Sequence, residues 1–303
     1  MSEIESKKYW IWLSLIKGIG CKRKQKLLQL YESPEVIYKM KENSLLKITG
    51  IGETAVKNIL DSSIRKDLNR HIQYMEKNSI DIISINDEEY PQILKEIYDP
   101  PISLYIKGDK NILNNKSIGI VGCRKASEYG EKSAKYFSYN LANQNFNIVS
   151  GLAKGVDTYA HVGSICAIKE DNYALVGRTI AVVGNGLDTI YPQENKELAK
   201  MILETGGAIV SEYPLGTKPE KMNFPARNRI ISGMSKGIVV IEAKEKSGTL
   251  ITVDFALEQG RDVFVVPGNI NSINSLGTNG LLKQGAKVVT TYKDILISYS
   301  NYN

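Results

Sequence analysis

The feature that most constrains this chain is an alternation of short apolar runs with amphipathic segments from residue 117 to residue 289. The apolar runs are short and rich in Val and Ile, so they indicate strands buried on both faces. The predicted strands are 118–121, 147–149, 179–183, 208–210, 238–241, 262–266 and 287–289. The predicted helices are 130–143, 157–168, 194–204, 224–234, 250–260 and 279–284. This alternation predicts an α/β fold with a doubly wound, mainly parallel sheet.

The residues that follow the predicted strands form the candidate site, because ligands of such sheets bind outside the carboxyl ends of the strands. Nearly every strand is followed by a glycine or another small residue: Gly122–Arg124, Ser150–Gly155, Gly184–Gly186, Ser211–Pro214, Glu242–Thr249 and Pro267–Gly268. Glycines allow a ligand to approach the backbone, and Arg124 and Lys154 supply positive charge. The pattern favours a ligand that carries phosphate.

The stretch Phe224–Gly260 predicts a helix, a strand, a glycine loop and a second helix. Arg227, Asn228 and Arg229 lie near the start of the first helix, where the helix dipole and free N–H groups favour an anion. Gly248 and Thr249 open the second helix and complete a phosphate cradle. The alternative is that the arginines lie on a solvated face and that Gly248 only makes a turn.

Residues 1–78 predict a small helical domain with two similar glycine turns, Lys17–Gly20 and Thr49–Gly52. The turns resemble the helix-hairpin-helix motif, in which backbone N–H groups can hold a DNA phosphate. Four basic residues follow the first turn and would add charge: Lys22, Arg23, Lys24 and Lys26. A plain connection between two short helices remains the alternative. Residues 79–116 predict a linker or edge segment, 117–297 the main domain and 298–303 a polar tail.

Composition excludes several classes of protein. The chain has 303 residues, of which 42% are hydrophobic, enough to bury a sizeable core. No apolar run approaches the ~20 residues of a membrane span, so no membrane association is expected. Three dispersed cysteines argue against a disulfide framework and for a reducing cytoplasm. Two histidines and the absence of a C-x-x-C pair argue against a structural metal site. The net charge of +6 permits a polyanionic partner.

No convincing catalytic constellation is present, and no P-loop motif occurs in the sequence. The segment Gly233–Gly237 matches G-x-S-x-G, but it ends a predicted helix and starts a strand, and no histidine follows it. Asp157 and His161 lie one helical turn apart, and a structural contact between them is expected. Phe224 is expected to fill the core rather than to stack on a base.

These motifs together resemble the DNA-processing protein A family, also called DprA or Smf, from about residue 90 to residue 295. The resemblance is carried by Ile120–Arg124, Ser150–Asp157, Thr179–Gly184, Tyr191–Pro192, Ser211–Pro214, Phe224–Arg229, Ser247–Thr252 and Val266–Gly268. It implies an extended Rossmann fold that binds single-stranded DNA, dimerises and hands the DNA to the recombinase RecA in natural transformation. It implies no catalytic residue and no cofactor. By motif position it implies contacts to DNA from Gly122, Arg124, Gly151, Lys154, Gly155, Lys221, Phe224, Arg227, Asn228, Arg229, Gly248 and Thr249.

The sequence departs from the family pattern in three places. Cys123 stands where the family usually has Ser or Thr, residues 169–175 read as an inserted surface loop, and the chain stops soon after Ile297, which leaves no room for a winged-helix domain. The alternative function is a mononucleotide-binding protein or an enzyme like the nucleotide phosphoribohydrolases. Thr252 stands where those enzymes have an acidic residue, which argues against hydrolysis.

Overall fold

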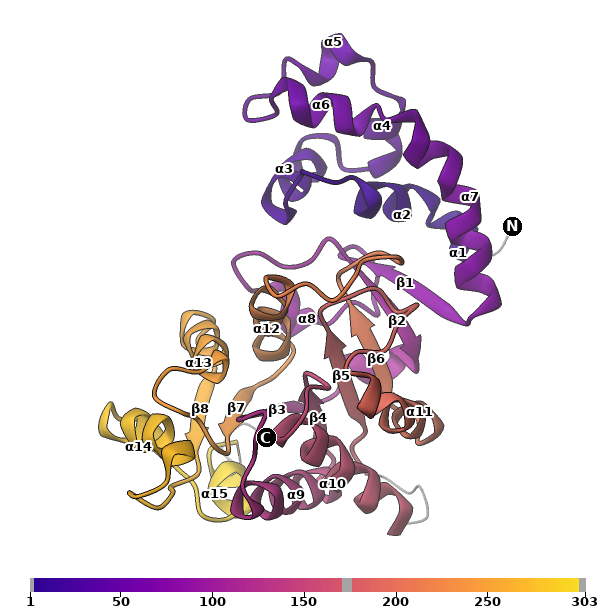
Figure 1. Ribbon diagram of the computed structural model, residues 1–303. Helices are drawn as coiled ribbons and strands as arrows, with labels where there is room; N and C mark the ends of the chain where they lie inside the picture. Colours follow the sequence, from indigo (N-terminus) through magenta and orange to yellow (C-terminus); the bar gives the residue numbers. More distant parts are fainter. Residues whose placement is uncertain (1–2, 171–175, 300–303) are drawn as a thin grey trace.

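The computed structural model describes residues 3–170 and 176–299 (Figure 1). The predicted insertion at 169–175 therefore lies mostly outside the described residues, as do residues 300–303 of the predicted tail. Tyr299 belongs to that tail, yet it packs against the main domain. Its ring centroid lies 6.2 Å from that of Phe146 and 6.1 Å from that of Phe264. Within the described ranges, no helix is both long and apolar enough to cross a membrane.

A nine-stranded sheet forms the centre of the molecule, in the order β1-β2-β6-β5-β4-β3-β7-β8-β9. The strands are β1 Ile80–Ser84, β2 Ser103–Gly108, β3 Ser117–Val121, β4 Asn147–Ser150, β5 Thr179–Val183, β6 Ala208–Ser211, β7 Gly237–Val240, β8 Asp262–Val265 and β9 Lys287–Val288. Strands β3 to β9 pair in parallel, whereas β2 pairs antiparallel with both β1 and β6. The predicted doubly wound, Rossmann-like sheet is confirmed, and segment 79–116 adds β1 and β2 to it.

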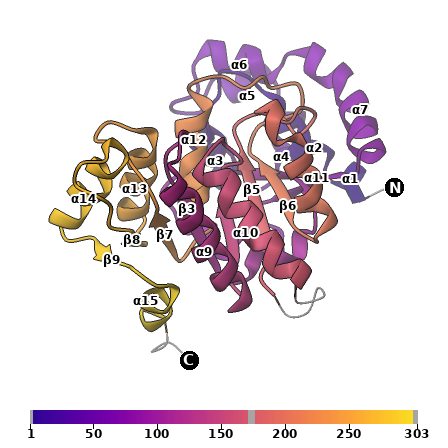
Figure 2. The same ribbon diagram turned by 60° about the horizontal axis from the view of Figure 1, so that its bottom comes forward.

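Helices cover both faces of the sheet (Figures 1 and 2). They are α8 Gln92–Lys95, α9 Glu128–Asn143, α10 Val156–Glu170, α11 Lys196–Glu204, α12 Asn223–Gly233, α13 Gly248–Glu258, α14 Leu276–Lys283 and α15 Tyr292–Ile297, with 3₁₀ helices η1 Lys110–Asn114, η2 Gln193–Asn195 and η3 Ile273–Ser275. On one face Val240 shares a buried cluster with Ile230 of α12 and Val253 of α13. On the other face Ile118 shares a cluster with Phe137 of α9.

The strand order places the topological switch point between β3 and β7. From β3 the chain winds outward through β4, β5 and β6, then returns to pair β7 with the other side of β3. Loops that leave adjacent strands in opposite directions open a crevice at the carboxyl ends. The residues after β3 and after β7 therefore meet at one place, as the sequence predicted.

The N-terminal region is helical, as predicted, and lies against the end of the sheet that carries β1, β2 and β6 (Figure 1). Its helices are α1 Glu3–Ser6, α2 Lys8–Leu15, α3 Cys21–Tyr31, α4 Pro34–Lys39, α5 Glu42–Leu45, α6 Glu53–Ile59 and α7 Ser62–Lys77. Both glycine turns use a left-handed residue, Gly18 with φ +72° and Gly50 with φ +89°. Trp12 and Tyr105 belong to one continuous core, so this region packs firmly on the sheet.

Lys24 departs from the expectation that it adds exposed charge after the first glycine turn. Its side chain is 8% exposed, and its ammonium donates a hydrogen bond to the Ser14 carbonyl at 2.9 Å. Burial lowers the pKa of Lys24 to about 8, although the nearby Glu212 carboxylate opposes the shift. The start of α3 faces the main domain, because Gly20, Cys21 and Lys24 line a space of 440 Å³ that Glu212 also lines.

The buried Lys24 gives a pH-dependent contribution to stability. Between pH 8 and the pKa of about 10.4 of an unfolded lysine, the unfolded chain binds more protons than the folded chain. The free energy of unfolding therefore rises with pH across this window, by on the order of 2 kcal/mol. Urea denaturation at pH 7.5 and pH 10 measures the rise, and Lys24→Met is expected to remove it. Equal pH slopes for the two proteins would contradict this assignment.

Candidate nucleic-acid interface

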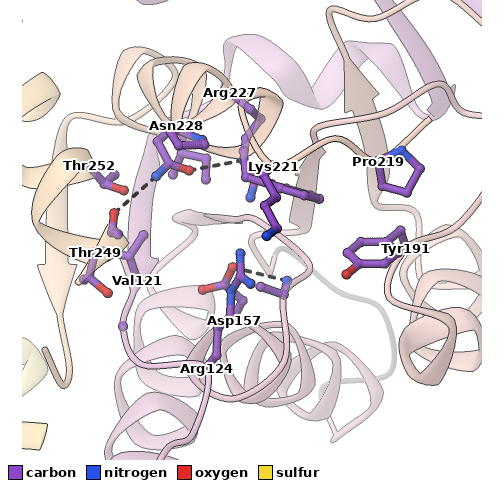
Figure 3. A pocket seen from close by; sticks show the side chains of 16 residues that line it. Val121, Arg124, Asp157, Tyr191, Pro219, Lys221, Arg227, Asn228, Thr249 and Thr252 are labelled. Atoms are coloured by element: carbon purple, nitrogen blue, oxygen red, sulfur yellow. Dashed lines mark hydrogen bonds between the residues drawn. The ribbon is translucent and has the colours of Figure 1, made fainter. Parts of the chain in front are cut away.

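A cavity of 530 Å³ opens at the carboxyl edge of the sheet, between the loops after β3 and β4 and the starts of α12 and α13 (Figure 3). Eight of the twelve residues predicted for the site line it: Gly122, Arg124, Lys221, Phe224, Arg227, Asn228, Gly248 and Thr249. Eight further lining residues were not predicted as site residues: Val121, Ala153, Asp157, Tyr191, Pro219, Pro225, Ile231 and Thr252. The switch point therefore gathers residues that are more than a hundred positions apart in the sequence.

Two exposed cations face each other across the cavity. Arg124 extends from the loop after β3 and Lys221 from the segment before α12, and Figure 3 shows their side chains pointing toward one another. Within the part of the chain that the structure describes, neither makes a salt bridge. Their charges are thus available to an anion that enters the cavity.

Two aromatic rings form one wall. The Phe224 and Tyr191 ring centroids lie 5.6 Å apart with an interplanar angle of 33°, and the Arg124 guanidinium carbon lies 5.7 Å from the Phe224 centroid. Phe224 is half-buried, so the prediction that it fills the core is wrong. It lies against Gly184, where an added Cβ would be 3.1 Å from its Cδ1. The ring is therefore partly covered, and it lines the cavity.

Arg227 lines the cavity from within the wall. It is 4% exposed, and its Nη1 donates hydrogen bonds to the Gly151 carbonyl at 2.7 Å and to the Val182 carbonyl. Burial lowers the pKa of Arg227 to about 10, although the Asp157 carboxylate opposes the shift. The guanidinium stays charged at neutral pH and joins α12 to the carboxyl ends of β4 and β5.

Asp157 lies in the first turn of α10 and holds the glycine loop that precedes the helix. Its Oδ2 accepts hydrogen bonds from Gly151 N at 3.1 Å and Ala153 N at 3.3 Å. The predicted contact with His161 is wrong, because the histidine Nδ1 lies 2.6 Å from Thr179 Oγ1 inside the core. Burial lowers the pKa of His161 to about 3, which keeps the ring neutral. The carboxylate instead holds two backbone N–H groups of the loop that precedes α10.

The other four predicted residues lie outside the cavity lining. Gly151 separates Arg227 from Asp157, since an added Cβ would lie 2.6 Å from Arg227 Nη2 and 2.6 Å from Asp157 Oδ2. Gly155 has φ +78° and lies against the backbone of Cys123 and Arg124. Lys154 is exposed and makes an ion pair with Glu194. Arg229 points away from the cavity and pairs with Asp99 and Glu212.

The start of α13 completes the cavity on the side opposite the aromatic wall. Ser247 precedes the helix without a side-chain capping bond, so backbone N–H groups of the first turn are free of a side-chain partner. Asn228 Nδ2 donates a hydrogen bond of 3.4 Å to the Gly248 carbonyl and ties α12 to this turn. Thr252, rather than an acidic residue, faces the cavity. This arrangement supports anion binding and offers no carboxylate at that position.

The fold and the cavity together define a Rossmann-like protein with a cationic, aromatic-walled site at its switch point. The sequence model described as DNA recombination-mediator protein A matches residues 81–300, and the chain belongs to that family. It is 42% identical to Protein Smf of Escherichia coli over 232 residues, which cover 77% of this chain and 60% of that protein. It is 42% identical to DNA processing protein DprA of Bacillus subtilis over 246 residues, 81% of this chain and 80% of that one. The chain thus spans less than two thirds of the E. coli protein's length.

Solved structures of DNA processing protein A from two organisms are similar to this one. The X-ray structure of DprA from Streptococcus pneumoniae matches with a TM-score of 0.80 at 37% identity, over 96% of this chain and 97% of that chain. A structure of DNA processing protein A from Helicobacter pylori, described for its unique single-stranded DNA binding mode, matches with a TM-score of 0.63 at 28% identity. That match covers 73% of this chain and 96% of the other.

Proposed function

We propose that this protein binds single-stranded DNA in the cavity at the carboxyl edge of its sheet. The observation that carries the proposal is the pair of exposed cations, Arg124 and Lys221, facing each other beside the rings of Phe224 and Tyr191. Cations neutralise the phosphate backbone, and aromatic rings stack on bases whatever their sequence. The single-stranded DNA binding mode described for the H. pylori protein supports the same ligand.

Single strands suit this site better than a duplex. The aromatic wall lies inside a cavity of 530 Å³, so a base must leave its own stack to reach it. A duplex presents only its phosphates at such an entrance. The proposed site has no catalytic role, and we expect little preference for sequence.

From the family we further propose that the protein acts as a homodimer in the cytoplasm and passes its DNA to the recombinase RecA during natural transformation. We also propose three working parts: residues 1–78, the segment 79–116 and the main domain 117–297. The homodimer and the transfer to RecA rest on the family resemblance, the cytoplasm on the dispersed cysteines, and the three parts on the sequence patterns.

Arg124→Ala is expected to weaken single-strand binding by about 1.5–3 kcal/mol, roughly 10- to 150-fold in Kd. The expected loss exceeds that of an ordinary surface charge, because a charge-assisted hydrogen bond to phosphate would form beside an aromatic wall. Fluorescence anisotropy with a labelled oligonucleotide, single- and double-stranded, measures it. For wild type, log K should fall with log salt by about 0.7 for each phosphate neutralised.

Lys132→Ala is the matched control for Arg124→Ala. Lys132 is also exposed, but it lies on α9 and pairs with Glu128 of the same helix. Equal affinities for Arg124→Ala and wild type would place the DNA elsewhere. Adding AMP as a competitor tests the alternative that Gly248, Thr249 and the start of α13 bind a mononucleotide. Displacement of DNA by low AMP concentrations would favour that alternative and call for a hydrolysis assay.

A further inference from the structure

Glu242 is a buried carboxylate that the cavity does not use. It follows β7 by two residues and is 1% exposed. Its side chain reaches the start of α9, where Oε2 accepts a hydrogen bond from Ser127 N at 3.0 Å and Oε1 accepts one from Ser127 Oγ. Ser127 Oγ in turn accepts from Gly130 N at 3.1 Å, so the carboxylate extends the cap of this 16-residue helix.

The place that Glu242 occupies is where a Rossmann-type sheet ordinarily receives a phosphate. In such folds an anion binds at the N-terminus of the helix that follows the strand at the switch point. Here that strand is β3 and that helix is α9, and the carboxylate comes from the end of the neighbouring strand β7. Gly130 has no side chain, and an added Cβ would collide with Glu242 Oε2, so the carboxylate lies directly on the first turn.

Asn274 connects the carboxylate to the loop that carries Arg124. Its Nδ2 lies 2.9 Å from the Lys125 carbonyl and 3.3 Å from Glu242 Oε2. The backbone of Glu242 also contacts the loop, since a Cβ at Gly122 would lie 3.0 Å from the Glu242 carbonyl. The loop from Gly122 to Ser127 therefore lies close to the backbone of Glu242 at its beginning and is hydrogen-bonded to the Glu242 side chain at its end.

We propose that Glu242 is an internal anion that fills the phosphate position of the fold and thereby positions Arg124 for DNA. Glu242 is a positioning residue: it acts through the loop and touches no ligand. The proposal deepens the DNA-binding function and rests on it. It also implies that the N-terminus of α9 is not available to the phosphate of a ligand, because the protein's own carboxylate already occupies it.

The sign of one measurement separates positioning from simple electrostatics. Long-range electrostatics predicts that removing a negative charge near bound DNA tightens binding. Positioning predicts that Glu242→Gln weakens it, because an amide cannot accept from all of these donors and its NH₂ group would face N–H groups. We expect the Kd for a single-stranded oligonucleotide to rise roughly tenfold. This rise is at the lower end of the increase in Kd expected for Arg124→Ala.

A double-mutant cycle with Arg124→Ala tests whether the effect passes through that residue. Glu242→Gln should add little in the Arg124→Ala background, because coupled residues are non-additive. Glu245→Gln is the charge control, because Glu245 is an exposed acidic residue in the loop after β7 that also contains Glu242. This substitution should leave Kd unchanged or lower it slightly. Unchanged or tighter binding by Glu242→Gln, or full additivity with Arg124→Ala, would overturn the proposal.

Two further measurements cover the case in which Glu242→Gln folds poorly. Asn274 is half-buried, and Asn274→Ala removes its hydrogen bond to the Lys125 carbonyl. This substitution should also raise the Kd for single-stranded DNA. Adding acetate to Glu242→Ala should restore DNA affinity, with chloride at equal ionic strength as the control. Tight binding by Asn274→Ala, or no difference between acetate and chloride, would count against the proposal.

Amide hydrogen exchange distinguishes failure of this proposal from failure of the DNA-binding function. The Ser127 and Gly130 amides should exchange faster in Glu242→Gln than in wild type without any DNA present. If the two amides exchange faster in Glu242→Gln but wild type binds no DNA, the positioning role of Glu242 is supported and the proposed DNA-binding function is wrong. If their exchange is unchanged, the positioning role of Glu242 is wrong, whatever the result for DNA binding.

Discussion

Replacing Arg229 with alanine is expected to lower the free energy of unfolding by about 3–5 kcal/mol. Arg229 is 5% exposed, its guanidinium donates two hydrogen bonds of 2.8 Å to Glu212, and its Nε lies 3.0 Å from Asp99 Oδ2. Burial opposes the charged form, but Glu212 and Asp99 outweigh it and raise the pKa of Arg229 above its usual value. Alanine would leave two carboxylates close together without their shared cation.

Urea denaturation at neutral pH measures this loss, and Lys132→Ala provides the comparison. The pair of Lys132 with Glu128 is largely exposed, so its removal should change stability by less than about 0.5 kcal/mol. Adding Glu212→Gln to Arg229→Ala should recover part of the loss, because it removes one of the uncompensated charges. A loss below about 1 kcal/mol for Arg229→Ala would contradict the ion-pair account.

The two arginines of α12 show what a sequence pattern can and cannot predict about this site. Arg227 and Arg229 are two residues apart, and residues at that spacing point to opposite sides of a helix. One side of α12 faces the cavity and the other faces the junction with the N-terminal helices. The sequence placed both near an anion site, but it did not show that Asp99 and Glu212 would lie beside Arg229 and pair with it.

The fold was more predictable than the site, for a physical reason. Parallel strands buried on both faces require continuous Val- and Ile-rich runs, and each predicted run from residue 117 onward became a strand. β2 was missed because Ser103–Gly108 follows Pro100 and Pro101, which resemble a linker, and because its antiparallel pairing with β6 is non-local. The six predicted helices of the main domain end within about three residues of the observed ends, because helix ends depend on caps rather than on periodicity, whereas α8 and α15 were not predicted.

The site residues that escaped prediction depend on contacts across the fold. Tyr191 enters the cavity because the segment between β5 and η2 brings it beside Phe224, a neighbour 33 positions along the chain. Its adjacent Pro192 marked a family motif, which was the available signal. Arg124 and Gly248 could be predicted from glycines and basic residues after the strands, because the carboxyl ends of parallel strands meet at one edge of the sheet. Side-chain partners across the sheet have no comparable local signal.

Asp157→Ala is expected to be about as damaging as Arg229→Ala, with a loss of about 3–5 kcal/mol in the free energy of unfolding. The carboxylate supports the N–H groups of Gly151 and Ala153 and lies on the other side of Gly151 from the buried Arg227 guanidinium. Alanine would leave the buried Arg227 cation without a nearby negative charge, and the N–H groups of Gly151 and Ala153 without an acceptor. Because this loop forms one wall of the cavity, single-strand affinity should fall as well, measured on protein that is still folded at low temperature.

Asp157→Asn separates the carboxylate's charge from its role as an acceptor. Burial raises the pKa of Asp157 above the usual aspartate value, although Arg227 opposes the shift. Between the unfolded and the raised folded pKa the folded protein binds more protons, so this group's contribution to stability rises as pH falls through the folded pKa. Asparagine keeps one acceptor and lacks the titration, so it should cost less than alanine and should remove that part of the pH dependence. Two results together would contradict this expectation: an equal loss of stability for asparagine and alanine, and no gain in the stability of wild type over asparagine at acidic pH. They would mean that Asp157 contributes its charge facing Arg227 rather than its hydrogen bonds to the loop.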